Sequence, residues 1–309
     1  MSPRAPDVGN LSDTRARDNR MRDAARRTLM FVAALALAAA AWEIYKAVGP
    51  DNGGDLLGMH VLPKAENRAM PHIWEMLSRF RHAEVRGSHR TIFDSVASGA
   101  WYSFRIALAG LALGTAIGFG LAVFMARFRI VERGLLPWLV VSQTVPLIAL
   151  APLVESWGGR LRIGAFTWQP WMSAAIIAAF LAFFPMAVGA LRGLSSPPAA
   201  SVELMASYAA PWRSSLWKLR IPAAVPFLLP AFRLAANAAV VGTVVAEIST
   251  GLRGGIGRLV LEYMREATGD PAKVYTAVLG ASVMGLAMAA LVASTEKLVM
   301  RNRRAGAVA

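Results

Sequence analysis

Six long apolar stretches, separated by short charged ones, follow one another along the chain of 309 residues. A helix needs about 20 apolar residues to cross the hydrocarbon core of a bilayer. The pattern therefore predicts six transmembrane helices and an all-α integral membrane protein. The predicted spans are at roughly residues 29–49, 100–125, 135–157, 171–191, 223–249 and 275–296.

Prolines interrupt two of these stretches. The third contains Pro146 and Pro152, and the fifth begins with Pro222, Pro226 and Pro230. Membrane helices tolerate proline where neighbouring groups satisfy the backbone carbonyls that it frees. We therefore expect kinked or broken helices at these positions rather than loops in lipid.

Small residues recur at a fixed spacing in the second predicted span. Gly110, Gly114 and Gly118 lie four residues apart, and Gly120 follows closely. Glycines at this spacing let helix backbones approach one another closely in lipid. We expect them to pack against another helix of the same chain, with a contact between subunits as the alternative.

The segments between and beyond the spans differ in character. Residues 72–82 place Ile73, Trp74, Leu77 and Phe80 on one helical face, which predicts an amphipathic helix on the outer membrane surface. The predicted organisation is a basic cytoplasmic tail (1–28), a first transmembrane helix (29–49), an extracytoplasmic loop (50–99), a membrane domain (100–300) and a second cytoplasmic tail (301–309).

Composition supports a membrane location and sets the orientation. The chain is 56% hydrophobic and 17% charged, whereas soluble domains are about 45–50% apolar. The net charge of +14 lies beside apolar spans rather than on one basic face, so we expect no nucleic-acid partner. With both termini inside, more than half of the 33 Lys and Arg residues fall in cytoplasmic segments, as positive-inside topology requires.

Familiar catalytic and metal-binding patterns do not occur in the sequence. It has no Gly-x-x-x-x-Gly-Lys-Ser/Thr loop for nucleotide phosphates and no Gly-x-Ser-x-Gly nucleophile motif. It contains no cysteine, and its four histidines, all in the 50–99 loop, lack metal-ligand spacing. We therefore expect no enzyme activity and no cofactor or metal on this chain. Uphill transport would draw its energy from a partner or an ion gradient.

The segment between the fourth and fifth spans, residues 195–226, has more internal order than a plain connector. Small residues gather at its centre and would form a compact knob that enters a groove on a partner. Trp212 and Trp217 would supply anchoring area, as aromatic residues do at interface hot spots. The segment reads in order as a stop at Pro197-Pro198, a helix from about Ser201, a break at Pro211, a second short helix at 212–220, and Pro222.

This segment resembles the cytoplasmic EAA loop of bacterial ABC-importer permeases. The family pattern is Glu-Ala-Ala, three residues, Gly, nine residues, a hydrophobe, one residue and Leu-Pro. Glu203 falls on the Glu, Leu219 on the hydrophobe, and Ile221-Pro222 on the Leu-Pro. Leu204 and Met205 stand in place of the two alanines, and Ala209 stands in place of the glycine.

These departures would make the knob bulkier. They fit a heterodimer in which the second permease has the more regular loop, and a fully active homodimer would contradict that hypothesis. Two further segments, 141–159 and 244–260, are similar to the nitrate/sulfonate/taurine-type branch, the second by a Glu followed by a Gly-x-Gly turn. The resemblance covers about residues 95–300 and implies that the last five spans form a type I (MetI-like) permease core.

The resemblance also implies partners and a place in the cell. Two permeases, identical or different, would pair in the bacterial inner membrane, receive solute from an extracytoplasmic binding protein, and dock a cytoplasmic ABC ATPase dimer that binds ATP and Mg²⁺. Glu203 would orient the loop by capping a helix or by pairing with Arg213. The implied coupling residues are Glu203, Ala206, Ser207, Ala209, Ala210, Pro211, Trp212, Arg213 and Pro222.

Polar residues within the spans are candidates for the solute pathway, because such groups are costly in lipid and usually face a cavity or a partner. Arg233 and Asn237 share a face of the fifth helix. We expect Arg233 near the inner half of the pathway, Glu247 near its outer mouth, and Gln143 in the third span. The alternative is that Arg233 pairs with a carboxylate inside the bundle or reaches to the inner interface.

Two other function classes fit a polytopic protein. A secondary transporter should show related halves, which we do not find, and no ATPase-docking loop. A membrane anchor or assembly subunit would not need polar groups or kinks in its spans. The similarity to one branch suggests small organic anions, sulfonates, nitrate or vitamin-like heterocycles as solutes.

Overall fold

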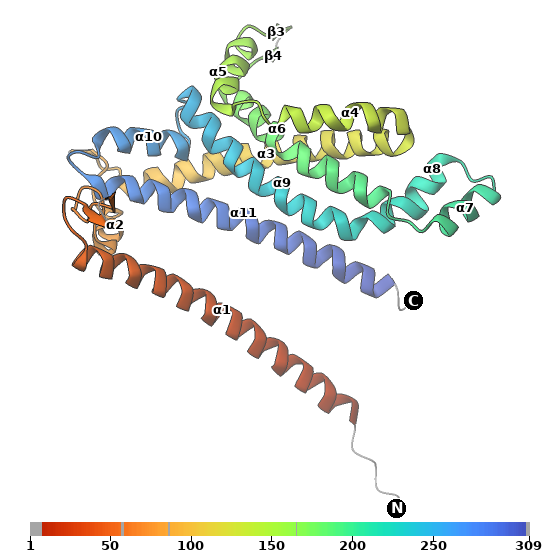
Figure 1. The fold of residues 1–309 in the computed structure, drawn as a ribbon, viewed down its shortest axis with the longest axis horizontal. Coiled ribbons are helices and arrows are strands. Elements are labelled where there is room, and N and C mark those ends of the chain that lie inside the picture. Colours follow the sequence, from red (N-terminus) through yellow and green to blue (C-terminus); the bar gives the residue numbers. More distant parts are fainter. Residues whose placement is uncertain (1–7, 57–58, 86, 165, 307–309) are drawn as a thin grey trace, which may run out of the picture. The chain divides into compact units, whose positions relative to one another are not determined.

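The computed structural model describes residues 8–56, 59–85, 87–164 and 166–306. These residues are mostly helical (Figure 1), in keeping with the predicted all-α membrane class. The chain divides after Leu77 into two compact units, which are described separately. Five helices are long and apolar enough to cross a membrane, or six if one sharply bent pair is a single span.

The first unit combines one long helix with a small polar region. Helix α1 (Val8–Val48) contains the first predicted span at Leu29–Val48. Strands β1 (Gly54–Leu56) and β2 (Met59–Leu62) pair in antiparallel fashion. Helix α2 (Ile73–Arg79) confirms the expected helix in a shorter form, and the side chains of Trp74 and Leu77 are exposed.

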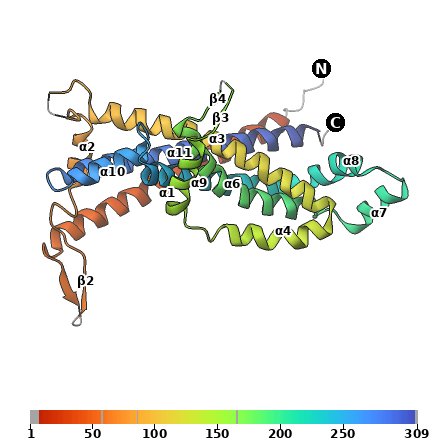
Figure 2. The same ribbon diagram turned by 90° about the horizontal axis from the view of Figure 1, so that it is seen from above.

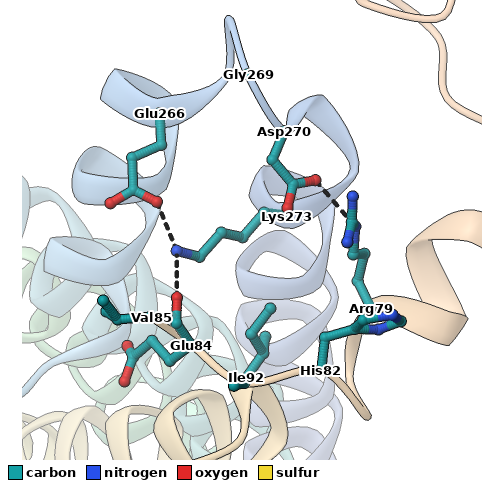
Figure 3. A pocket seen from close by; sticks show the side chains of 10 residues that line it. Arg79, His82, Glu84, Val85, Ile92, Glu266, Gly269, Asp270 and Lys273 are labelled. Atoms are coloured by element: carbon teal, nitrogen blue, oxygen red, sulfur yellow. Dashed lines mark hydrogen bonds and ion pairs between the residues drawn. The ribbon is translucent and has the colours of Figure 1, made fainter. Parts of the chain in front are cut away.

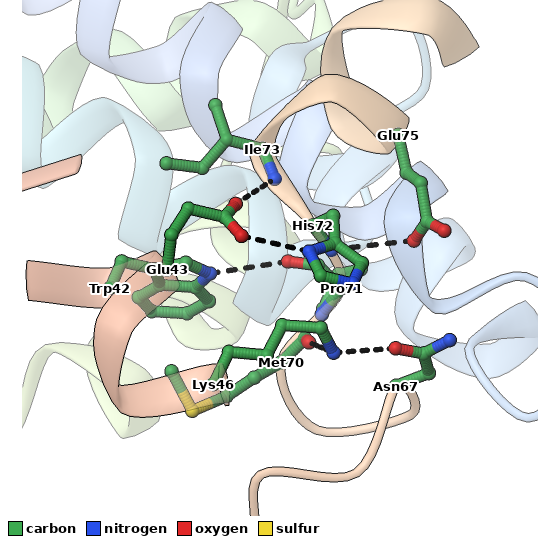
Figure 4. A network of polar contacts seen from close by, with 9 residues as sticks. All are labelled: Trp42, Glu43, Lys46, Asn67, Met70, Pro71, His72, Ile73 and Glu75. Carbon is green, nitrogen blue, oxygen red and sulfur yellow. Dashed lines mark hydrogen bonds and ion pairs between the residues drawn. The ribbon is translucent and has the colours of Figure 1, made fainter. Parts of the chain in front are cut away.

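Polar contacts hold the segment before α2 against the last turns of α1 (Figure 4). The Glu43 carboxylate accepts a hydrogen bond from the Ile73 backbone N–H at 2.9 Å and contacts His72 Nδ1 at 2.8 Å. Trp42 Nε1 donates to the Pro71 carbonyl, and Lys46 Nζ donates to the Met70 carbonyl. Side chains one helical turn apart on α1 thus fix the backbone that leads into α2.

The second unit is a bundle of long helices. Helices α3 (Ile92–Arg127), α6 (Pro170–Leu194), α9 (Ile221–Thr250) and α11 (Pro271–Gly306) correspond to four predicted spans. Helix α3 begins well before residue 100 because Thr91 and Asp94 form a capping box. The two views agree that α3, α6 and α9 run alongside one another (Figures 1 and 2).

The third predicted span is two helices. Helices α4 (Arg129–Ser142) and α5 (Leu147–Gly158) meet at an angle of 101°. The break comes at Pro146, the N-cap of α5, as the proline pattern predicted. Pro152 lies inside α5 without interrupting it. The broken helix expected in the third span is therefore confirmed at Pro146 and not at Pro152. The turn beyond α5 contains the paired strands β3 (Arg162–Ile163) and β4 (Phe166–Thr167).

The fifth span begins earlier than predicted. Helix α8 (Trp212–Ser215) continues through a π-helical segment η1 (Leu216–Arg220) directly into α9. The helix expected at 212–220 is present, but it is continuous with the fifth span rather than separate from it. A proline ring normally clashes with the carbonyl four residues before it, here Lys218, and the wider π turn lies at that position.

Small side chains let α3 and α6 approach closely. A Cβ at Gly110 would lie 2.4 Å from the Ala178 Cβ, and one at Gly114 would lie 2.8 Å from the Ala179 carbonyl oxygen. This confirms the predicted contact within the chain. The core around it is rich in alanine and includes Ala107, Ala178, Ala182, Ala231, Ala235 and Ala239.

We predict that Gly114→Val destabilises the bundle by about 1–3 kcal/mol, because the larger side chain must separate two packed backbones. The measurement is the thermal unfolding midpoint of the purified full-length protein. Gly120→Val is the matched control on the same helix, since a Cβ at Gly120 meets nothing within 4 Å. Equal midpoints for the two variants would contradict the close contact.

Candidate functional site

The loop between α6 and α9 projects beyond the ends of these helices (Figures 1 and 2). Its helix α7 (Ala199–Ser207) follows Pro198, and no residue of α7 is buried. Pro211 forms the N-cap of α8, which confirms the predicted break. The predicted residues Glu203, Ala206 and Ser207 lie on α7, Ala209 to Pro211 link the helices, Trp212 and Arg213 lie on α8, and Pro222 opens α9.

Helix α7 ends in a Schellman motif, in which two backbone N–H groups bond back to the last turn. Ala210 N–H donates to the Met205 carbonyl at 3.0 Å, and Ala209 N–H donates to the Ala206 carbonyl at 2.9 Å. Ala209 has φ +47°, the left-handed conformation that favours glycine. Ala209 stands where the EAA pattern has glycine. Its main effect is therefore strain in the loop backbone, rather than the added bulk of the side chain.

Two large side chains give α7 an exposed apolar face. Leu204 is 57% exposed and Tyr208 is 76% exposed. They are four residues apart and so lie on the same side of the helix. Sequence reasoning treated Leu204 only as a departure from a pattern and passed over Tyr208. Their spacing was the signal that would have found them.

Trp212 is half-buried and packs against two arginines of the same chain, and its expected anchoring role at a partner stays a prediction. The Arg220 guanidinium lies 4.8 Å from its ring centroid, and the Arg127 guanidinium lies 5.3 Å away. Arg220 also donates through Nη1 to the Leu194 carbonyl at 2.9 Å. Trp212 thus fastens α8 to the ends of α3 and α6, whereas Trp217 is 69% exposed.

Glu203 lies in the middle of α7, so it does not cap that helix. Within the described part of the chain it makes no ion pair with Arg213, and its pairing with another nearby base stays a prediction. Its side chain lines a cleft together with Arg129, Arg133 and Arg220. Glu203 therefore belongs to the surface between α7 and the start of α4.

Glu247 is wholly buried and does not lie at the mouth of a pathway within this chain, contrary to the expectation. Its carboxylate accepts from Ser103 Oγ at 2.6 Å and from the Gly257 backbone N–H at 2.8 Å. Ser103 Oγ accepts in turn from the Ile256 N–H at 2.8 Å. These bonds satisfy the first N–H groups of helix α10 (Ile256–Glu266).

The glycines after Glu247 make room for its carboxylate. A Cβ at Gly255 would lie 2.2 Å from the Glu247 carboxyl carbon, and one at Gly257 would lie 2.7 Å from the Val244 carbonyl oxygen. The Glu and Gly-x-Gly pattern at 244–260 is therefore a helix anchor. The buried carboxylate joins α9 to the N-terminus of α10, next to Ser103 on α3.

Arg233 pairs with a carboxylate, which was the alternative reading of this residue. Its guanidinium contacts Glu296 of α11 and its side chain is 61% exposed, against 14% for Glu296. Asn237, one turn along α9, is also exposed. Gln143 lies at the break between α4 and α5 and bonds to Ser142. The roles of these residues in a pathway stay predictions.

A cluster of charged side chains lies where residues 82–85 and Ile92 meet α10 and the start of α11 (Figure 3). Lys273 Nζ donates to Glu266 and to the Glu84 carbonyl, and Arg79 Nε lies 3.0 Å from Asp270. Tyr263 donates to the Glu84 carboxylate at 3.1 Å. Burial and that carboxylate raise the pKa of the Tyr263 hydroxyl above its ordinary value, so it remains a donor. The cluster fastens this end of the bundle.

We predict that Ala209→Gly strengthens the end of α7 by about 1 kcal/mol, because glycine adopts the left-handed conformation without strain. Hydrogen exchange of the α7 amides should slow in this variant. Ala206→Gly is the matched control and should speed exchange, since glycine inside a helix costs about 1 kcal/mol. Faster exchange in both variants would contradict the strained end.

We predict that Glu247→Ala destabilises the protein by about 1–3 kcal/mol, because it leaves the buried Gly257 N–H and Ser103 hydroxyl without an acceptor. Glu247→Gln keeps one acceptor oxygen and should lose less. Thermal unfolding of the two purified variants checks this order. A larger loss for glutamine than for alanine would contradict the anchoring role.

Comparison with known proteins identifies the family to which most of the helical bundle belongs. Residues 114–301 match the family described as binding-protein-dependent transport system inner membrane component. The chain is 31% identical to the formylaminopyrimidine transport permease protein ThiX of Halalkalibacterium halodurans, over 63% of this chain and 73% of that protein.

Two further relatives carry names for other solutes. The chain is 26% identical to SsuC of Bacillus subtilis, named for aliphatic sulfonates transport, over 65% of this chain and 68% of SsuC. It is 28% identical to the riboflavin transport system permease protein RibX of Chloroflexus aurantiacus, over 57% of this chain and 61% of RibX. With the family match covering more than half of its length, the chain belongs to the inner-membrane permease subunits of ABC importers.

Proposed function

We propose that this permease couples to a separate cytoplasmic ABC ATPase through residues 195–222, with α7 as the docking helix. The observation that carries the proposal is the exposed face of Leu204 and Tyr208 on a helix with no buried residue. Exposed apolar side chains on a projecting helix are typical of an interaction site. The loop lies on the cytoplasmic side in the orientation favoured by the Lys and Arg distribution.

Contacts within the loop support transmission of movement to the membrane. Trp212 lies between Arg127 and Arg220, so the chain beyond α7 is fastened to the ends of α3 and α6. Segments α8, η1 and α9 then form one continuous helical run. A displacement of α7 by the ATPase would therefore move α9, whose exposed face carries Arg233 and Asn237.

The remaining partners follow from the same proposal. Two permeases, identical or different, pair in the bacterial inner membrane with their termini in the cytoplasm, and an extracytoplasmic binding protein delivers the solute. ATP and Mg²⁺ bind to the ATPase rather than to this chain. Closure of the ATPases on ATP favours one of two packed states of the permeases. This arrangement accounts for the loop better than an ion-gradient transporter or a membrane anchor does.

The solute is proposed as a small organic molecule. The relatives are named for formylaminopyrimidine, aliphatic sulfonates and riboflavin, which are small polar or anionic compounds. Arg233 and Asn237 offer hydrogen-bond donors on an exposed face of α9. Gln143 adds a further amide at the break between α4 and α5.

We predict that the double variant Leu204→Ala/Tyr208→Ala no longer retains a stoichiometric ABC ATPase when the full chain is purified from its native membrane. Loss of two interface anchors should weaken binding by about 100-fold or more. Trp157→Ala, which removes an exposed aromatic side chain outside residues 195–222, is the control and should retain the ATPase. Equal retention by the double variant would exclude α7 as the docking helix.

We predict that Arg233→Ala lowers solute uptake at equal expression more than Arg233→Lys does, because lysine keeps a cation beside Glu296. Uptake into cells or vesicles, with the solute affinity and the turnover measured separately, is the assay. Unchanged affinity and turnover in both variants would remove Arg233 from the pathway.

A further inference from the structure

A cleft of about 660 Å³ lies beside the coupling loop, between the start of α4 and the start of α7. Three arginines, Arg129, Arg133 and Arg220, line it together with Glu132 and Glu203. The guanidinium groups therefore outnumber the carboxylates. These arginines belong neither to the proposed docking face of Leu204 and Tyr208 nor to the exposed face of α9 that carries Arg233 and Asn237.

Arg220 adds a third positive charge to the wall of this cleft. Its Nη1 bonds to the Leu194 carbonyl, and its planar group lies over the Trp212 ring. These two contacts hold the guanidinium group in place. Hydrogen bonds between arginine and an oxyanion are among the strong ones in proteins, so a fixed guanidinium here favours an anion.

The backbone adds positive character to the same cleft. The 14-residue helix α4 begins at Arg129, and its N-cap residue Phe128 makes no side-chain capping bond. The first N–H groups of a helix carry partial positive charge and attract anions. Arg129 and Arg133 lie one turn apart on this helix and are both exposed.

The cleft lies at the level where the membrane spans end. Helix α3 ends at Arg127, α6 ends at Leu194, and Arg220 immediately precedes α9. Next to Arg129, the side chains of Phe128 and Ile130 are 46% and 88% exposed. Arginines beside exposed apolar side chains at the cytoplasmic end of spans match the headgroup layer of a bilayer.

We propose that this cleft binds a phosphate-type oxyanion supplied by the headgroup of an anionic phospholipid of the inner leaflet. The phosphodiester group would accept from Arg129 and Arg133 beside the positive charge of Arg220, while the acyl chains lie along the exposed apolar side of α4. Free phosphate has the same acceptor chemistry, but it would not use the apolar surface. The bound lipid would join α4 to the start of α7.

The test uses the purified full-length protein in detergent, with phosphatidylglycerol, phosphatidylcholine or inorganic phosphate added, and native mass spectrometry as the readout. Wild-type protein should retain phosphatidylglycerol in preference to phosphatidylcholine. Arg129→Gln/Arg133→Gln should weaken this retention by roughly fivefold for each arginine removed. Arg160→Gln/Arg162→Gln, which removes two exposed arginines elsewhere, is the matched control and should behave as wild type.

Arg220→Gln provides a second arm that removes the third positive charge at the cleft. Retention of phosphatidylglycerol should fall in this variant, while its unfolding midpoint shows whether it remains folded. Equal retention of the two lipids by wild type, or full retention by Arg129→Gln/Arg133→Gln, would overturn the proposal. Binding of inorganic phosphate without any lipid preference would reject the lipid as the source. If the arginine variants lose the ATPase but retain phosphatidylglycerol as wild type does, the arginines bind a protein partner, and the lipid proposal is overturned.

Discussion

The backbones of α3 and α6 touch along Gly110, Gly114 and Gly118, and the arrangement of the second unit depends on this contact. In lipid, helices gain little from hiding apolar side chains from water, so association rests on close van der Waals packing. Alanines on α6 and α9 extend the same close packing to the next helix. The result is a tightly packed set of helices, and the polar contacts and loops described above lie at its two ends.

The two ends of that bundle are fastened in different ways. At the end that carries the loop between α6 and α9, two arginines lie over the Trp212 ring, and α7 has no buried residue. At the other end, the Glu247 carboxylate and Ser103 satisfy the first N–H groups of α10, and the Glu84, Tyr263 and Lys273 contacts fasten its far side. Charged groups thus anchor both ends of the bundle.

Much of this arrangement follows from patterns of local sequence. Span positions, the break at Pro146, the glycine contact and helix α7 are set by residues close in the chain, so they could be predicted. The burial of Glu247 and the enclosure of Trp212 could not, because both depend on residues more than 80 positions away, Ser103 and Arg127. The continuity of 212–220 with the fifth span was not predicted, because a π turn cannot be recognised from Pro222 alone.

The continuous helical run from Trp212 to Thr250 has a mechanical consequence. Its 39 residues extend for about 58 Å at 1.5 Å per residue. If it pivots near its middle by about 10°, simple lever geometry moves each end by about 5 Å, roughly one helical turn. A small tilt imposed at the Trp212 end would therefore reach the carboxylate that holds α10 as a displacement comparable to the width of a small solute.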